Sequence, residues 1–448
     1  MKAEQQIGSS ITDASVEVPS AGLARVLTFR DLLIYGVAYV SPISAWGTFA
    51  YVYSLASGAV MLAYTAGIVC LYFTAQSYSS MANEVEGSGS AYAYASLAFG
   101  PRLGFVAGWM VLLDYILMPA LMYVLGAVAL GALWPGAPRP LLIMSFAAVS
   151  LLLNWFGIRA SAKANLILVG IQAAAALTYV LWAFAAAPQS PIDWLPTSAW
   201  WNAKVSAHGT IAATSLCLLA FIGFDAVTTL AGEVRKDHRP LVGRAVICTL
   251  AIVAVMALLQ VWVMAGVAQG YAFADLATGP FDMTAARIHP LAGAAMAWFG
   301  ALAVGFAITP PAQVAVSRVL YAMARDGTLP SSLGVLDPRT QMPRRAILLS
   351  VFIASGVALG FQAVPDQLTT LVNFGALAAF ISVHLSVVGW FHFQRKSGQL
   401  AKHVLMPAIG IATIVAVMTQ MNANALWLGL GWLVLGVSIA TARAPNVT

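Results

Sequence analysis

The sequence predicts an all-α integral membrane protein with about twelve transmembrane helices. Of its 448 residues, 60% are hydrophobic and 8% are charged, whereas a soluble domain carries about 25% charged residues. Apolar runs of about 20 residues recur along the chain, and each is long enough to cross roughly 30 Å of hydrocarbon. The alternating ten-residue pattern of an outer-membrane barrel is absent, which leaves a helical bundle as the expected class.

The expected spans are apolar stretches that end at glycine, proline or charged residues. They cover residues 32–57, 60–83, 104–131, 140–157, 164–187, 209–231, 243–269, 290–324, 345–363, 367–392, 403–420 and 424–442.

The distribution of basic residues predicts the orientation. With the N-terminus placed inside, 19 of the 22 lysines and arginines fall in inside segments, and Arg139, Lys204 and Arg287 fall outside. This asymmetry follows the positive-inside rule, so both termini are expected in the cytoplasm. Residues 1–27 are polar and lack the pattern of a signal peptide, which predicts a mobile cytoplasmic tail.

Several function classes are not expected. The net charge of +6 follows the membrane topology and does not indicate nucleic-acid binding. Cys70, Cys217 and Cys248 lie in apolar runs, so we expect packed free thiols. The sequence has no glycine-rich phosphate loop with lysine, no zinc-protease motif and no cysteine pairs at metal-binding spacing. We therefore predict no metal, no cofactor and no enzyme activity.

Two spans are expected to be interrupted near mid-depth. In the first span, Pro42 removes a backbone donor and clashes with the preceding turn. In the sixth, Gly223 precedes Asp225, and a carboxylate in hydrocarbon costs roughly 3 kcal/mol unless it faces a cavity or a partner. The two spans cross the membrane in opposite directions. Paired interruptions of this kind indicate an inverted-repeat transporter with its binding site at the midplane.

Two acids are the main candidates for the site. Asp225 could be a counter-charge or proton carrier for a cationic solute, or it could bond the backbone amides that the break frees. Asp114 and Tyr115 lie about ten residues, or roughly 15 Å, into the third span. A role in solute or proton binding is the default interpretation of such an acid, and the alternative is a buried hydrogen bond to another helix.

Coupling and gating candidates lie farther along the chain. His384 could carry a coupling proton, or it could be a neutral histidine bonded to a backbone carbonyl. Arg318 could close the inner mouth by pairing with Glu233 or Asp326, or it could be an interfacial anchor that snorkels to water. An aromatic wall for an ammonium group could include Tyr39, Trp46, Phe221 and Phe224, although each ring could equally be packing.

The chain resembles the amino acid–polyamine–organocation superfamily, and most of all its bacterial putrescine importers. The segments that carry the resemblance are Gly36–Pro42, Glu86–Tyr92, Gly108–Tyr115, Gly223–Leu230, Ser317–Gly327 and Asn373–Leu377.

The resemblance implies a five-plus-five inverted repeat with broken first and sixth helices. The repeats would cover 28–187 and 188–400, and 401–448 would hold two further helices and a short tail. It also implies solute uptake across the inner membrane, usually by proton symport. The implied solute site is lined by Tyr39, Val40, Ser41, Ser44, Asp114, Tyr115, Phe221, Gly223, Phe224 and Asp225.

Departures from the family pattern bear on the substrate. Ser41-Pro42 replaces a glycine-rich stretch whose amides hold a carboxylate in amino acid transporters, which favours a diamine. Gln172 stands where cationic amino acid transporters can carry a lysine. Glu233 remains where putrescine importers tend to have two acids, and His384 stands where asparagine is expected. We therefore predict import of a putrescine-like amine with protons, or with sodium as the alternative coupling ion. An amino acid permease and a non-transporting sensor are the alternatives.

Overall fold

The computed structural model describes residues 23–85, 87–186, 192–421 and 423–442, and it is helical. Among these residues nine helices are long and apolar enough to span a membrane, or ten when one bent pair is counted as a span. Two shorter apolar helices, Arg139–Trp155 and Leu426–Ala442, match the expected spans 140–157 and 424–442. The all-helical membrane class is confirmed, and the total of twelve spans stays a prediction.

The helices follow one another in this order: α1 (Phe29–Val40), α2 (Ala45–Leu55), α3 (Val60–Ala82), α4 (Ala91–Phe99), α5 (Pro101–Leu133), α6 (Arg139–Trp155), α7 (Ile158–Ala186), η1 (Thr197–Ala199), α8 (Ala207–Leu219), η2 (Phe224–Glu233), η3 (Arg239–Leu241), α9 (Val242–Val267), α10 (Gly279–Arg287), α11 (Pro290–Leu302), η4 (Ala303–Ala307), α12 (Thr309–Arg325), η5 (Ser331–Gly334), α13 (Arg344–Phe361), α14 (Pro365–Val387), η6 (Val388–Gln394), η7 (Ala401–Leu405), α15 (Met406–Met418) and α16 (Ala423–Ala442).

The first span is broken where the sequence predicts. Thr28 caps α1 in a reciprocal capping box with Asp31, and the helix ends at Val40. Ser41 then adopts a left-handed φ of 73° ahead of Pro42, and the chain resumes as α2 at a bend of 52°. The missing amide of Pro42 explains why the helical hydrogen bonds stop at this point.

The sixth span changes helix type. The α-helix α8 ends at Leu219, and Gly223 has a left-handed φ of 114°. The chain continues as η2, a 3₁₀ helix of ten residues. Runs of 3₁₀ helix longer than three or four residues are uncommon and often mark functional hinges. The predicted interruption is therefore present, but as a change of winding within a single candidate span, Ala207–Glu233.

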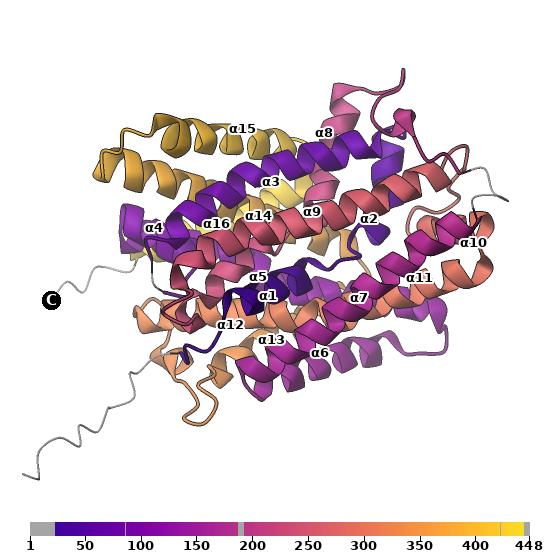
Figure 1. Cartoon of the computed structure of the whole chain (residues 1–448). Helices are drawn as coiled ribbons and strands as arrows, with labels where there is room; N and C mark the ends of the chain where they lie inside the picture. Colours follow the sequence, from indigo (N-terminus) through magenta and orange to yellow (C-terminus); the bar gives the residue numbers. More distant parts are fainter. Residues whose placement is uncertain (1–22, 86, 187–191, 422, 443–448) are drawn as a thin grey trace, which may run out of the picture.

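The two interrupted segments lie against each other inside the bundle. In Figure 1, α1 runs through the middle of the bundle, and it contacts η2, α7, α9 and α12. A side chain at Gly223 would collide with the ring of Tyr39, and one at Gly36 would collide with Val227 of η2. Only glycine permits these two close approaches.

The polypeptide before α1 is also fastened to η2. The backbone amides of Val26 and Leu27 both donate to the carbonyl of Glu233, and Arg235 donates back to Leu27. These bonds form an isolated parallel bridge between Leu27 and Val234. The expected mobile tail, 1–27, therefore has an ordered end at residues 26 and 27, whereas residues 1–22 lie outside the described part of the chain. Residues 443–448 of the expected C-terminal tail also lie outside it.

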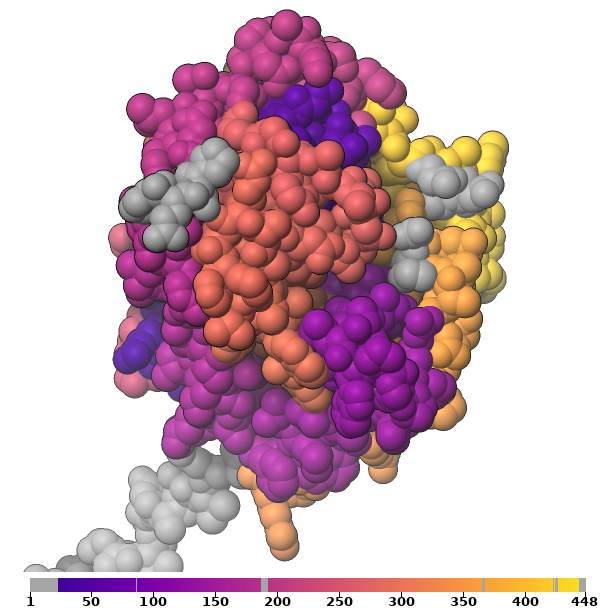
Figure 2. Space-filling model, turned by 90° about the vertical axis from the view of Figure 1, so that its right-hand side faces the viewer, coloured from indigo at the N-terminus to yellow at the C-terminus, as the bar shows by residue number. Residues whose placement is uncertain are grey.

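The opposite end of the bundle is covered by the segment that includes α10. Figure 2 looks onto this end and shows the coral segment across the centre of the face. Phe273, which precedes α10, packs its ring edge-on against Phe49 and Tyr53 of α2 at centroid distances of 6.4 Å and 5.5 Å. The segment before α10 thus covers α2, the second half of the first span, at this end.

Candidate functional site

Two carboxylates meet in the centre of the bundle. Asp114 lies on α5 and Asp225 lies in the first turn of η2, and their side chains are 1% and 2% exposed. Tyr115, the residue after Asp114, bonds to Asp225, which places the two acids near each other. The Oδ1 atom of each has no hydrogen-bond partner among the described residues. Leaving buried carboxylate oxygens without donors is costly, so this pair favours a cationic partner.

Tyrosine hydroxyls surround the second acid. Tyr115 donates a hydrogen bond of 2.7 Å to Oδ2 of Asp225. The ring of Tyr39 lies 6.5 Å from that of Tyr115, and its buried hydroxyl has no partner in the described structure. The hydroxyl of Tyr78 on α3 also lies beside the Asp225 carboxylate. The site therefore combines negative charge with phenol groups that can donate or accept.

Aromatic faces close the site on the side of α3 and α14. Tyr78, Phe224 and Phe380 form a cluster with centroid distances of 5.8 to 6.3 Å. Sequence analysis missed Tyr78 and Phe380, because nothing in their local pattern distinguishes them from packed aromatics of a membrane helix. Glycine brings α14 to the site: a side chain at Gly375 would lie 2.6 Å from the backbone nitrogen of Asp114.

The polar groups of the first break turn toward neighbouring helices. Ser41 donates a hydrogen bond from its hydroxyl to Oε1 of Gln172 on α7. Gln260 on α9 donates a 2.8 Å bond to the carbonyl of Pro42. Val40 is buried, and the buried hydroxyl of Ser44 has no partner among the described residues. The structure thus shows that Gln172 holds the broken stretch of the first span through Ser41, which its position in the sequence did not suggest.

An ion pair closes the end of η2. Arg318 on α12 donates from Nε to Glu233 at 2.7 Å and from a terminal nitrogen at 3.2 Å. Arg318 is 0% exposed, so the interpretation as a snorkelling anchor is wrong. Asp326, the other expected partner, accepts a bond from Tyr92 on α4 instead. The pairing with Glu233 is confirmed, and a gating role stays a prediction.

His384 bonds to α3 and to neither of the two acids. Its ring nitrogens face the hydroxyls of Ser77 at 2.8 Å and Thr74 at 3.2 Å, both on α3. The ring also rests on Gly410 of α15. The expected backbone carbonyl partner is therefore wrong, because both partners are side-chain hydroxyls of α3. Its proposed part in proton coupling is not tested by this geometry.

The proposed aromatic wall divides into two parts. Tyr39 and Phe224 lie beside the acids, as described above. Trp46 instead packs on Tyr179 of α7 at 5.9 Å, and Phe221 packs edge-on against Tyr64 of α3 at 6.2 Å. The described residues contain no group of three potential ligands that could hold a metal ion. The arrangement is suited to binding a cation through carboxylates, hydroxyls and ring faces.

Known proteins similar to this chain include several transporters. It is 28% identical to the low-affinity putrescine importer PlaP of Escherichia coli K12 over 93% of this chain and 92% of that protein. It is 29% identical to the branched-chain amino acid permease BcaP of Bacillus subtilis, over 83% and 80%. It is 26% identical to the methylthioribose transporter of B. subtilis, over 90% and 88%. An amino acid permease family model matches residues 32–440, and the chain belongs to this family of membrane transport proteins.

Proposed function

We propose that this permease imports a small organic cation, putrescine or a closely related amine, by proton symport. The buried pair of Asp114 and Asp225 is the observation that carries this proposal. A diamine presents two ammonium groups, and each would meet one carboxylate oxygen that lacks a partner. The methylene chain between them would lie against Tyr39, Tyr115 and Phe224.

The energetics favour a cation over a neutral solute at these acids. Burying two like charges in a low-dielectric site is unfavourable unless opposite charge accompanies them. Ring faces of Tyr and Phe attract ammonium groups by roughly 0.5–2 kcal/mol. A negative-inside membrane potential adds about 2.3 kcal/mol per charge per 100 mV in favour of entry. The similarity to a putrescine importer supports the same substrate class.

The backbone of the first break supports an amine rather than an α-amino acid. Pro42 has no amide, and the amides of Ser41 and Ser44 already donate to Val37 and Ser41 carbonyls. Of the four positions 41–44, three therefore have no free amide for a substrate carboxylate, the group that amides at a broken helix would hold.

The transport cycle follows from the proposed repeat. Residues 28–187 and 188–400 would form two inverted repeats within twelve spans, followed by two helices in 401–448. The broken segments α1–α2 and α8–η2 would rock against the remaining helices to open each side in turn. The ion pair of Arg318 with Glu233 and the segment at Phe273 would close the two ends. Cytoplasmic termini in a bacterial inner membrane complete the proposal.

Uptake into proteoliposomes tests the substrate and the coupling together. We expect accumulation of labelled putrescine when the outside is acidic, and loss of accumulation when a protonophore collapses the gradient. Accumulation driven equally by a sodium gradient would contradict proton coupling. Uptake of alanine or leucine, with no entry of or competition by putrescine, would contradict the amine assignment.

Charge-neutralising variants test the two acids. Asp114→Asn and Asp225→Asn should each lower kcat/KM for putrescine by about 30-fold or more, because removing one partner of a buried charge pair costs 2 kcal/mol or more. Asp282→Asn is the matched control, because this aspartate is exposed on α10. Unchanged uptake by both central variants would contradict the proposed site.

An amino acid permease is the second candidate, because the relatives include branched-chain amino acid permeases. A thermal-shift panel of amines and amino acids separates the two, since a ligand that binds only the folded protein raises its melting temperature. A clear shift with putrescine but no uptake in vesicles would identify a non-transporting sensor.

A further inference from the structure

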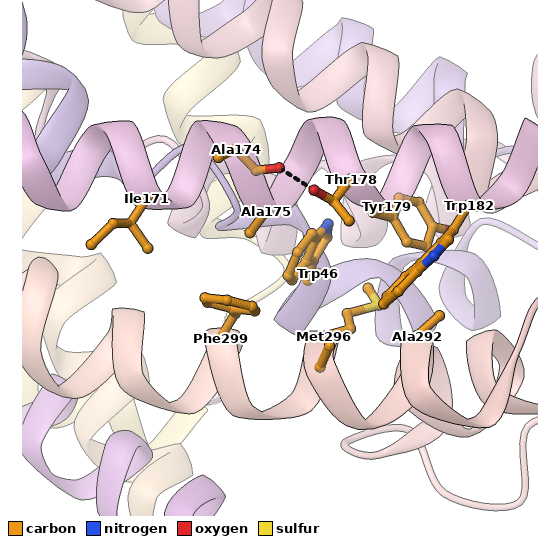
Figure 3. A pocket seen from close by; sticks show the side chains of 11 residues that line it. Trp46, Ile171, Ala174, Ala175, Thr178, Tyr179, Trp182, Ala292, Met296 and Phe299 are labelled. Atoms are coloured by element: carbon orange, nitrogen blue, oxygen red, sulfur yellow. Dashed lines mark hydrogen bonds between the residues drawn. The ribbon is translucent and has the colours of Figure 1, made fainter.

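A side cavity lies between α7 and α11, next to the beginning of α2. Its volume is about 250 Å³, and Figure 3 shows its lining side chains. Every side chain that lines it is uncharged. Asp114, Asp225 and the tyrosines that surround them do not line this cavity, so it is separate from the central site.

The mouth of the cavity faces the surface of apolar spans. Ile171 on α7 is 47% exposed and Phe299 on α11 is 40% exposed. Both residues belong to candidate membrane spans, Ile158–Ala186 and Pro290–Arg325. A solute that reaches this mouth would therefore arrive through the hydrocarbon of the bilayer.

One buried donor distinguishes the cavity from a purely apolar gap. The indole N–H of Trp46 has no hydrogen-bond partner among the described residues, and the side chain is 2% exposed. Figure 3 shows this nitrogen turned toward α7, near Ala175 and Thr178. The hydroxyl of Thr178 donates to the carbonyl of Ala174 in its own helix. Because a buried N–H without an acceptor is costly, the cavity favours an occupant that brings one.

We propose that this cavity binds an uncharged, bilayer-soluble small molecule with a compact apolar body and one hydrogen-bond acceptor. An apolar cavity of about 150 Å³ holds benzene. The larger volume here therefore suits a substituted ring of about ten carbons. A carbonyl or ether oxygen on the ring would accept from Trp46, and the ring would lie between α7 and α11.

Photolabelling of the purified full-length protein in lipid nanodiscs tests this site. The probe is a cyclic ketone of the size of menthone that carries a diazirine. We expect labelling of peptides that contain 171–182 and 292–299. Menthone should compete about tenfold better than its hydrocarbon analogue p-menthane, because the analogue lacks the acceptor for one hydrogen bond.

Two variants distinguish binding in the cavity from partitioning of the probe into the surrounding lipid. Trp46→Phe keeps an aromatic ring but removes the N–H, so it should abolish the tenfold preference for menthone. Ala174→Phe places a large side chain at the exposed mouth and should abolish labelling. The matched control Ala251→Phe adds the same side chain on an exposed part of α9 and should label as the wild type does.

The opposite results would overturn the proposal. Labelling spread evenly over all exposed spans would show partitioning into the surrounding lipid and no built site. Equal competition by menthone and p-menthane in the wild type would show that Trp46 donates no bond to the ligand. Wild-type labelling of Ala174→Phe would place the ligand elsewhere. Because the readout is binding, these results do not depend on which solute the permease carries.

Discussion

The first interrupted span bends by 52° between α1 and α2, whereas α8 and η2 remain within one candidate span. At the first break, side chains from other helices hold the loosened backbone: Gln172 accepts from Ser41, and Gln260 donates to the Pro42 carbonyl. At the second, the turn residues 220–223 separate α8 from η2, whose tighter winding begins at Phe224. Under the proposed function, the first break would form part of the wall of the site, and the second would present Asp225 to the solute.

The largest expected effect on stability concerns the ion pair of Arg318 with Glu233 at the end of η2. Arg318→Met or Glu233→Met should each lower the free energy of unfolding by about 3–5 kcal/mol, because each leaves a buried charge without its partner. Unfolding in mixed micelles measures this effect. The double variant Arg318→Met with Glu233→Met should lose less than either single variant. Equal losses in all three would show that packing, rather than charge, fastens η2 to α12.

The next effect concerns the left-handed residue of the second break. Gly223→Ala should lower the free energy of unfolding by about 2–4 kcal/mol, from backbone strain at a φ of 114° and from a clash with Tyr39. Putrescine uptake should fall with it, since Tyr39 must move from the acids. If both stability and uptake were unchanged, the contact between the two breaks would be unimportant.

A smaller effect is expected at the first break. Gln260→Leu removes the donor to the Pro42 carbonyl and should lower the free energy of unfolding by about 1–3 kcal/mol. Gln76→Leu is the matched control, because the bond of Gln76 to Tyr72 is exposed, and its loss should cost little. If Gln260→Leu lowered the free energy of unfolding as much as Arg318→Met, the first break would depend on partners from other helices as strongly as η2 does.

The smallest expected effect on stability tests whether α2 tolerates a residue with a higher helix propensity. Gly47 lies two residues into α2, and a methyl group there would meet no atom within 4 Å. Gly47→Ala should therefore stabilise the protein by about 0.5–1 kcal/mol, since alanine favours the helix. A decrease in the melting temperature would instead show that α2 needs backbone freedom next to the bend.

Local chemistry made some of these features predictable. Pro42 and Gly223 identified both breaks, because proline removes a helical donor and glycine admits the left-handed backbone found at position 223. The lengths of the apolar runs identified the membrane class, because length and composition alone decide whether a helix can cross a bilayer. The 3₁₀ winding of η2 was not predicted, since nothing in residues 224–233 forbids an α-helix.

Contacts between distant spans were beyond sequence reasoning. Arg318 could be an interfacial anchor or half of a buried pair, and only the position of Glu233, 85 residues away, decides between them. His384 and Gln172 have partners on helices that the sequence does not place beside them. Tyr78 and Phe380 were missed for the same reason, since only the folded bundle brings their rings against Phe224 of η2.

The short backbone bridge between Leu27 and Val234 bears on how motion could be observed. Together with the contacts at Gly36 and Gly223, it joins α1 and the residues before it to η2 at three places, so we expect the two segments to move together. A spin label or fluorophore at Ala24, outside the apolar helices, would then act as a remote reporter for the helix that carries Asp225. The motion of η2 would then be followed in real time without a label inside the bundle.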